Sequence, residues 1–423
     1  DTTTVTHTPE AGTVSATKSS STTTYAPGGT IVYTITVNNT GAGYALAVPV
    51  KDLISSNTTT LIGGGTGAAF SSWTIGATTT GTGTTSGTYN ANTDLDTTVN
   101  IAPSGSVTYT ITGTVVTGAT GNITNKGTIN SVDTTTVTHT AEAGVVSGTK
   151  TSGTTTYAPG GTIVYTLQIE NTGTGYALGI PVKDLISSNT TNLIGGGTGA
   201  AFGSWTIGAT TTGVGTTTGT YTNDSDLDTT VNIAPSGSVT YTITGTVVTG
   251  AIGNITNKAE VNGIDTTTVT HTPEAGTVSA TKSSSTTTYA PGGTIVYTIT
   301  VNNTGAGYAL AVPVKDLISS NTTTLIGGGT GAAFSSWTIG ATTTGTGTTS
   351  GTYNANTDLD TTVNIAPSGS VTYTITGTVV TGATGNITNK GTINSVDTTT
   401  VTHTAEAGVV SGTKTSGTTT YAP

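Results

Sequence analysis

Short stretches of the chain alternate strictly between apolar residues and threonine. The clearest are Thr30–Val37 and Val107–Thr112. A period of two places Ile31, Tyr33 and Ile35 on one face of the first stretch and its threonines on the other. This alternation predicts antiparallel strands with one buried face and one face in water.

Turn sequences stand directly before these two strands, Pro27-Gly28-Gly29 and Pro103-Ser104-Gly105. The same reasoning predicts further strands at Tyr44–Val50, Trp73–Ala77, Leu95–Ile101, Thr124–Val132 and Thr134–Thr140. No segment has a helical period. About seven short strands separated by turns predict an all-β fold, an antiparallel β-sandwich.

The pattern repeats at the length of a whole domain. The string DTTTVTHT begins every 132 residues, at Asp1, Asp133, Asp265 and Asp397. Residues 1–159 recur letter for letter as residues 265–423, whereas adjacent copies differ, so two versions, A and B, alternate. Because the period exceeds the roughly 20 to 45 residues of solenoid repeats, each copy is expected to have its own core.

The least patterned stretch, residues 12–24, is mostly Ser and Thr around Lys18, and we place the domain boundary there. The expected division is 1–15 as the last strand of a preceding repeat, 16–147 as type A, 148–279 as type B, 280–411 as type A again, and 412–423 as the start of another repeat. The chain has no Met, so we expect a piece of a longer array whose export signal and anchor lie outside it.

Composition narrows the possible functions. Charged residues make up 7% of the chain, and 10 lysines against 20 acidic residues give a net charge of −10. Nucleic-acid binding needs clustered cations, so no nucleic-acid partner is expected. No apolar run approaches the roughly 20 residues of a membrane span. The absence of Cys excludes disulfides and thiol chemistry.

Four ordered strings resemble a known family. They are YAPGGTIVYTITVNNTG from Tyr25, VPVKDLI from Val48, APSGSVTYTITGTV from Ala102 and GNITNKGTI from Gly121. Their order is similar to that of the immunoglobulin-like repeat catalogued as domain of unknown function eleven. The resemblance implies tandem immunoglobulin-like β-sandwiches in an extended rod, on the surface of a bacterium or archaeon, without known catalytic residues. The glycine-rich insert at 63–88 departs from the family pattern.

An Asp-Leu-Asp sequence in each repeat is the best metal candidate. Two carboxylates two residues apart in an extended segment point the same way, and calcium prefers several such oxygens. The alternative is a solvated turn that leads into the next strand. The calcium candidates are Asp94, Asp96, Asp226, Asp228, Asp358 and Asp360. No other cofactor is expected.

Each repeat has one histidine, in the sequence V-T-H-T. One histidine alone cannot form a catalytic triad or a zinc site, so we expect an ordinary strand residue at the margin of a packed face. The alternative is a pH-sensitive contact between neighbouring repeats. The candidates for contacts between repeats are Thr134, Val137, His139, Thr266, Val269 and His271.

The Lys51-Asp52 dipeptide ends an apolar strand and recurs in each repeat. We expect an exposed ion pair, worth roughly 0 to 1 kcal/mol. The alternative is a covalent cross-link of lysine to Asn or Asp, which needs an apolar pocket and a further carboxyl group.

These features favour a structural, non-catalytic role outside the cell, as a stalk or filament at a microbial surface. The alternative is an adhesin module that binds a glycan, a host surface or ice, for which threonine rows such as Thr108, Thr110 and Thr112 would supply hydroxyl groups. An enzyme would need convergent titratable groups. The expected partners are neighbouring repeats in one chain or copies of the protein along a fibre. The strand at 134–140 decides between these, because a donated strand would pair with another repeat.

Overall fold

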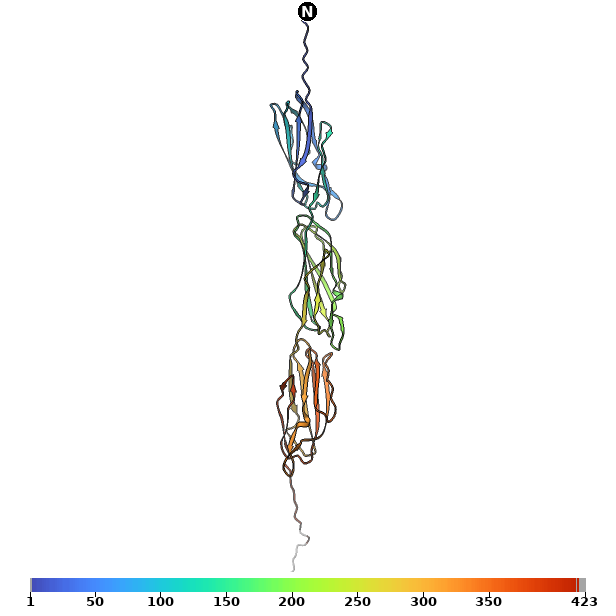
Figure 1. Cartoon of the computed structure of the whole chain (residues 1–423), viewed down its shortest axis with the longest axis vertical. Coiled ribbons are helices and arrows are strands. Elements are labelled where there is room, and N and C mark those ends of the chain that lie inside the picture. Colours follow the sequence, from blue (N-terminus) through green and yellow to red (C-terminus); the bar gives the residue numbers. More distant parts are fainter. Residues whose placement is uncertain (1, 416, 418–423) are drawn as a thin grey trace, which may run out of the picture.

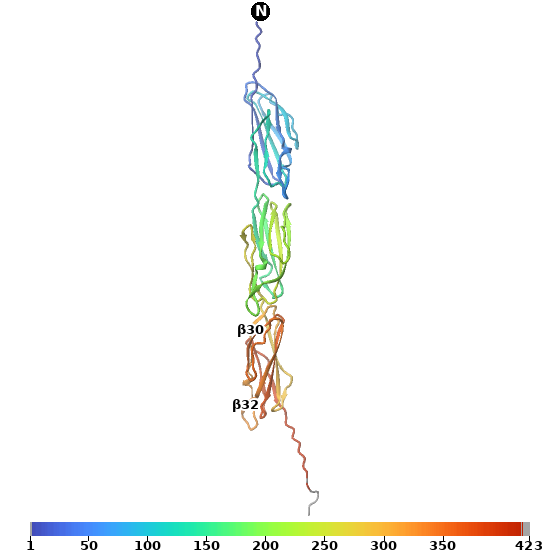
Figure 2. The ribbon, with the colours of Figure 1, turned by 90° about the vertical axis from the view of Figure 1, so that its right-hand side faces the viewer.

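The computed structural model describes residues 2–415 and 417 of the 423-residue chain. Three β-sandwiches follow one another end to end in an extended rod (Figure 1). The view turned by 90° has the same shape, so the molecule is long and narrow in both directions (Figure 2). No α-helix occurs in the described residues, and none of their segments could cross a membrane as a helix.

The elements have equivalent positions in all three repeats. The first repeat contains β1 (Val14–Ser20), β2 (Thr24–Tyr25), β3 (Thr30–Asn39), β4 (Ala45–Asp52), the 3₁₀ turn η1 (Ile54–Ser56), β5 (Thr58–Thr60), β6 (Thr66–Ala68), β7 (Phe70–Thr80), β8 (Leu95–Ile101), β9 (Ser106–Val115), β10 (Ile123–Asn125), β11 (Thr128–Ile129), β12 (Val132–Asp133) and β13 (Val137–Ala141).

The second repeat contains β14 (Val146–Ser152), β15 (Thr156–Tyr157), β16 (Thr162–Asn171), β17 (Ala177–Asp184), η2 (Ile186–Ser188), β18 (Thr190–Asn192), β19 (Thr198–Ala200), β20 (Phe202–Thr212), β21 (Leu227–Ile233), β22 (Ser238–Val247), β23 (Ile255–Asn257), β24 (Glu260–Val261), β25 (Ile264–Asp265) and β26 (Val269–Pro273).

The third repeat contains β27 (Val278–Ser284), β28 (Thr288–Tyr289), β29 (Thr294–Asn303), β30 (Ala309–Asp316), η3 (Ile318–Ser320), β31 (Thr322–Thr324), β32 (Thr330–Ala332), β33 (Phe334–Thr344), β34 (Leu359–Ile365), β35 (Ser370–Val379), β36 (Ile387–Asn389), β37 (Thr392–Ile393), β38 (Val396–Asp397) and β39 (Val401–Ala405).

Each sandwich has two layers. One layer is an antiparallel sheet in the order β1-β3-β9-β7. The other combines the sheet β12-β11-β4-β8 with the small sheet β10-β13-β2 and the hairpin β5-β6. Most neighbouring strands are antiparallel, but β2 and β13 pair in parallel. The predicted class, tandem immunoglobulin-like antiparallel β-sandwiches in an extended rod, is confirmed.

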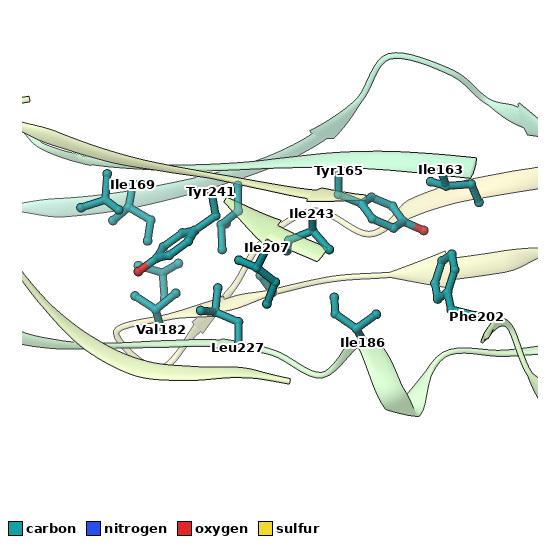
Figure 3. Close-up of a cluster of buried hydrophobic side chains, with 14 of the residues drawn as sticks. Ile163, Tyr165, Ile169, Val182, Ile186, Phe202, Ile207, Leu227, Tyr241 and Ile243 are labelled. Carbon is teal, nitrogen blue, oxygen red and sulfur yellow. The ribbon is translucent and has the colours of Figure 1, made fainter. Parts of the chain in front are cut away.

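Alternating side chains of both layers fill the core, as the sequence pattern predicts. In the second repeat Tyr165, Tyr241 and Ile243 of one layer face Val182 and Leu227 of the other (Figure 3). All five are 0% exposed. Because each repeat encloses such a cluster, each sandwich has a core of its own.

The predicted strands correspond to β3, β4, β7, β8, β9 and β13, and the segment 124–132 divides among β10, β11 and β12. The stretch in which the domain boundary was expected, residues 12–24, contains the seven-residue strand β1. The expected boundaries at 15/16 and 147/148 therefore fall inside β1 and β14. An edge strand needs only one buried side chain here, Lys18, so its sequence carries little apolar signal.

The strand β13 pairs with β10 and β2 of its own repeat. The equivalents β26 and β39 do the same in theirs. Each repeat therefore closes its own sheets without a strand donated from its neighbour, and in the described chain the repeats are linked covalently, one after another.

Candidate functional site

The connection between repeats is short and held on both sides. Only four residues separate the end of β13 from the start of β14. The backbone N–H of Glu142 donates to the Tyr25 carbonyl of the first repeat at 2.9 Å, and that of Gly144 donates to the Tyr176 carbonyl of the second at 3.2 Å. The Glu142 carboxylate also accepts a hydrogen bond from the Thr174 hydroxyl of the second repeat.

A glycine of the second repeat lets this connection lie directly against it. A Cβ atom at Gly175 would stand 1.6 Å from the carbonyl oxygen of Glu142. The second junction is built alike, because a Cβ at Gly307 would stand 1.6 Å from the carbonyl oxygen of Glu274. Only glycine fits there, so the connection is docked against the next sandwich and is not a free tether.

A second contact joins the two sandwiches beside the connection. Ile62 follows β5 in the glycine-rich hairpin of the first repeat. Its Cγ1 atom lies 2.9 Å from the place where a Cβ at Gly215 would stand, beside the Tyr176 ring. The Tyr176 hydroxyl is 2.9 Å from the Val214 carbonyl of its own repeat and 3.2 Å from the Thr117 carbonyl of the first.

The same contact recurs at the second junction. There Ile194 packs at Gly347 and Tyr308, and the Tyr308 hydroxyl lies 3.1 Å from the Thr249 carbonyl. In this contact an isoleucine of one repeat packs against a glycine and a tyrosine of the next. We call it the Ile–Gly–Tyr contact. It joins one end of a repeat to the opposite end of the next, an arrangement that extends a rod without closing it.

The first and last of the three described repeats show what the contact covers. Tyr176 and Tyr308 are 8% and 7% exposed, whereas their equivalent Tyr44, with no repeat before it in the described residues, is 49% exposed. At the other end Ile326, the equivalent of Ile62 and Ile194, is 79% exposed, whereas those two are half-buried. Each junction therefore covers a tyrosine and an isoleucine.

A group of polar residues lies inside each sandwich, away from the junctions. In the first repeat the Lys18 ammonium contacts the Asp52 carboxylate, and both side chains are 0% exposed. The Asn125 Nδ2 atom lies 3.4 Å from the same carboxylate oxygen, Oδ2. The Lys18 Nζ also lies 4.7 Å from the centre of the Tyr33 ring. Equivalent groups occupy the other repeats, at Lys150, Asp184 and Asn257 and at Lys282, Asp316 and Asn389.

Burial dominates the electrostatics of this group. Desolvation lowers the pKa of Lys18 and raises the pKa of Asp52, although each charge opposes the shift of the other. The Asp52 Oδ1 atom is buried and has no hydrogen-bond partner among the described residues. Beside the group, His139 contacts the Ser20 hydroxyl at 2.9 Å and packs edge-on against Tyr33, and burial lowers its pKa.

The expected surface pair of Lys51 with Asp52 is wrong. Neighbouring residues of a strand point to opposite faces, so Asp52 enters the core while Lys51 stays in water. The Lys51 ammonium instead lies 3.2 Å from the Asp96 carboxylate, with both side chains about half exposed.

The candidate calcium ligands do not converge. Both carboxylate oxygens of Asp94 accept hydrogen bonds from Ser55, at 2.8 Å from its N–H and 2.7 Å from its hydroxyl. Asp96 pairs with Lys51. Among the described residues no three His, Asp or Glu side chains gather in a way that could hold a metal ion. The other candidates follow suit, because Asp226 and Asp358 bond to Ser187 and Ser319, and Asp360 pairs with Lys315. Asp228 lies opposite Lys183 across β17 and β21.

The residues expected to contact neighbouring repeats lie inside their own. Val137 and His139 are in β13, and His139 is 0% exposed in the core. The Thr134 hydroxyl bonds to Gly127 of the same repeat. Val269, His271 and Thr266 have the same places in the second repeat. These residues therefore help to complete their own sandwich, and the junctions described above are formed by loops at its two ends.

Neither the buried polar group nor the Ile–Gly–Tyr contact was predicted from the sequence. Lys18 was placed at the domain boundary, and Ile62 and Tyr176 were not singled out. A signal for Lys18 did exist, since it stands at the same position in every otherwise Ser- and Thr-rich segment. The junction had a weaker signal in the G-x-G-Y sequence that ends at Tyr176.

No family model and no curated protein matches the chain. Among solved structures it is similar to the adhesin FdeC of Escherichia coli, with 16% identity over 93% of this chain and 97% of that one and a TM-score of 0.20. Invasin, a bacterial integrin-binding protein, has 12% identity over 93% and 60% and a TM-score of 0.26. The adhesin InvE of Yersinia pseudotuberculosis has 15% identity over 62% and 60% and a TM-score of 0.23. These values are too low to support any conclusion about function.

Proposed function

We propose that this chain is a spacer region of a long extracellular protein of a bacterium or archaeon, a stalk or filament without catalytic activity. The observation that carries the proposal is the docked junction, with the Ile–Gly–Tyr contact present at both places where repeats meet. A contact that each repeat can make with the next supports growth of a straight array by addition of copies.

The composition and the family resemblance support the location. Sandwiches without cysteine, with few charges and no clustered cations, suit a passive surface region better than a nucleic-acid or redox protein. The order of the strings from Tyr25 to Gly121 resembles the immunoglobulin-like surface repeat catalogued as domain of unknown function eleven. The partners that the proposal requires are neighbouring repeats in one chain, and association of copies along a fibre would be a further step.

Small-angle X-ray scattering tests the proposal on the chain and on a version lengthened by one further A-B pair. The maximum dimension should rise in proportion to the number of repeats, by roughly 40 to 50 Å for each. An increase with only the square root of the number of repeats would mean freely jointed domains, and the proposal would be wrong.

The threonine face supports a second candidate, an adhesin module that binds ice or a glycan. On the outer face of the sheet β1-β3-β9-β7, Thr34 stands opposite Thr110 and Thr36 opposite Thr108, with the last two hydroxyls 3.3 Å apart. Inhibition of ice recrystallisation, or retention on a glycan array, by the chain but not by a variant with Thr108, Thr110 and Thr112 changed to Lys would favour this function. If neither assay shows an effect, the spacer function is the one candidate that remains.

A further inference from the structure

Each repeat contains a lysine, an aspartate and an asparagine that meet in the core and that the rod shape does not require. In the first repeat Lys18 comes from β1, Asp52 from β4 and Asn125 from β10. We propose that every repeat forms an internal amide bond between the lysine Nζ and the asparagine Cγ, with the aspartate as the catalytic proton carrier. The sets are Lys18, Asp52 and Asn125; Lys150, Asp184 and Asn257; and Lys282, Asp316 and Asn389.

The geometry brings the two reacting groups to one oxygen atom. The Lys18 Nζ and the Asn125 Nδ2 both contact Oδ2 of Asp52, the latter at 3.4 Å. In the third repeat the Asn389 Nδ2 also lies 3.4 Å from Oδ2 of Asp316. The fold thus holds an amine and a carboxamide on the same carboxylate oxygen, which makes a reaction between them intramolecular.

The pocket favours the uncharged forms that the reaction needs. The desolvation penalty of burying two charges can exceed the free energy gained from their attraction. Here Lys18 and Asp52 have side chains that are 0% exposed, and desolvation lowers the lysine pKa and raises the aspartate pKa. Both shifts lead toward a neutral amine, which is a nucleophile, and a carboxylic acid, which can donate a proton.

The reaction balances without any other reagent. The lone pair of the neutral Lys18 Nζ attacks Cγ of Asn125 and forms the new C–N bond. Asp52 accepts a proton from the attacking nitrogen and donates one to Nδ2, the bond from Cγ to Nδ2 breaks, and ammonia leaves. At the end of the reaction the Asp52 carboxyl group has the same protonation state as at the start. Its Oδ1 atom, which is buried without a partner among the described residues, provides a second oxygen for the proton transfer.

The same chemistry argues for asparagine as the partner of the lysine. An amide between Lys18 and Asp52 would consume the carboxyl group of the pocket, and no acid would remain to protonate the departing water. The next acidic group that acts on Asp52 is Asp94, whose two oxygens are already bonded to Ser55 at the surface. With Asn125 as the electrophile, the three side chains fill three different roles.

The bond would lie where it reinforces a rod under tension. This mechanical consequence rests on the proposed function, whereas formation of the bond does not. The bond would join β1, the first strand of the repeat, to β10, which lies close to the end of the repeat in the sequence. Tension that enters at β1 would pass through the bond to β10, and β2 to β9 would lie inside a closed loop that carries no load.

The intact mass of the 423-residue chain tests the proposal. Loss of one ammonia, about 17 Da, is expected in each of the three repeats, and digestion should yield a branched peptide that contains Lys18 and Asn125. A mass equal to that of the unmodified sequence would overturn the proposal. Loss of one water per repeat, about 18 Da, would overturn the choice of asparagine in favour of aspartate.

The variant Asp52→Asn tests the role of the aspartate, since it keeps the shape of the side chain. It should lose ammonia in two repeats only, and the two unchanged repeats act as the internal standard. The control Asp96→Asn alters a nearby exposed carboxylate and should lose ammonia in all three. Full ammonia loss in Asp52→Asn would refute the catalytic role, and if that variant does not fold, the mass of the unaltered chain still decides whether the bond exists.

Discussion

Substitution of Tyr176 by alanine should loosen the first junction and leave the second intact. The tyrosine is 8% exposed, whereas its equivalent Tyr44, which has no repeat before it in the described residues, is 49% exposed. The junction therefore hides about two fifths of this residue. An aromatic side chain buries about 200 Å² in full, so the hidden part is about 80 Å², worth about 2 kcal/mol.

The hydroxyl adds to this value. It lies 3.2 Å from the Thr117 carbonyl of the preceding repeat, a bond worth about 0.5 to 1 kcal/mol. The expected total of about 2.5 to 3 kcal/mol corresponds to a drop of about 70- to 160-fold in the ratio of docked to undocked junctions. The matched variant Tyr44→Ala removes the same contacts within a repeat but none between repeats, so the difference between the two variants isolates the junction.

Electron microscopy of single molecules with one labelled end measures the effect directly. In Tyr176→Ala the angle between the first and second sandwiches should spread widely, while the angle at Tyr308 in the same molecules keeps its narrow distribution. In Tyr44→Ala both junctions should stay straight. If the two junctions of Tyr176→Ala bend equally little, the contact does not hold the rod, and the reasoning from buried area is refuted.

Three further predictions concern stability. The variant Gly175→Ala should unfold at a lower temperature because its methyl group would collide with a linker carbonyl, whereas the control Gly208→Ala, with no atom within 4 Å, should change little; equal melting temperatures would contradict this. Asn171→Ala should lower the free energy of unfolding of its repeat in urea by about 3 kcal/mol, because its buried amide bonds to three carbonyls and two N–H groups; a change below about 1 kcal/mol would argue against it. Burial lowers the pKa of His139, so the unfolded state binds more protons and the free energy of unfolding should fall as the pH drops below 6.5. The variant His139→Gln should weaken this dependence of stability on pH between pH 7.5 and 5, whereas the variant His7→Gln, at an exposed position, should not.

The sequence alone determined the fold class, the repeat length and most of the strands. Alternation at Ile31, Tyr33 and Ile35 defines a strand with one buried face, whatever lies on the other side of the core, because side chains of a strand alternate by geometry. The period of 132 residues likewise follows from the string that begins at Asp1 and Asp133. These are local properties of the chain, so they can be read without its partners in space.

Only the tertiary structure decided which polar residues meet. Asp52 was assigned to its neighbour Lys51, but the pleat turns the two apart and brings in Lys18, 34 residues away in a strand with almost no apolar signal. Ile62 and Tyr176 became a junction because two sandwiches stack end to end. Pairing of distant residues depends on strand order and on the packing of one repeat against the next. A local sequence pattern encodes neither of these arrangements.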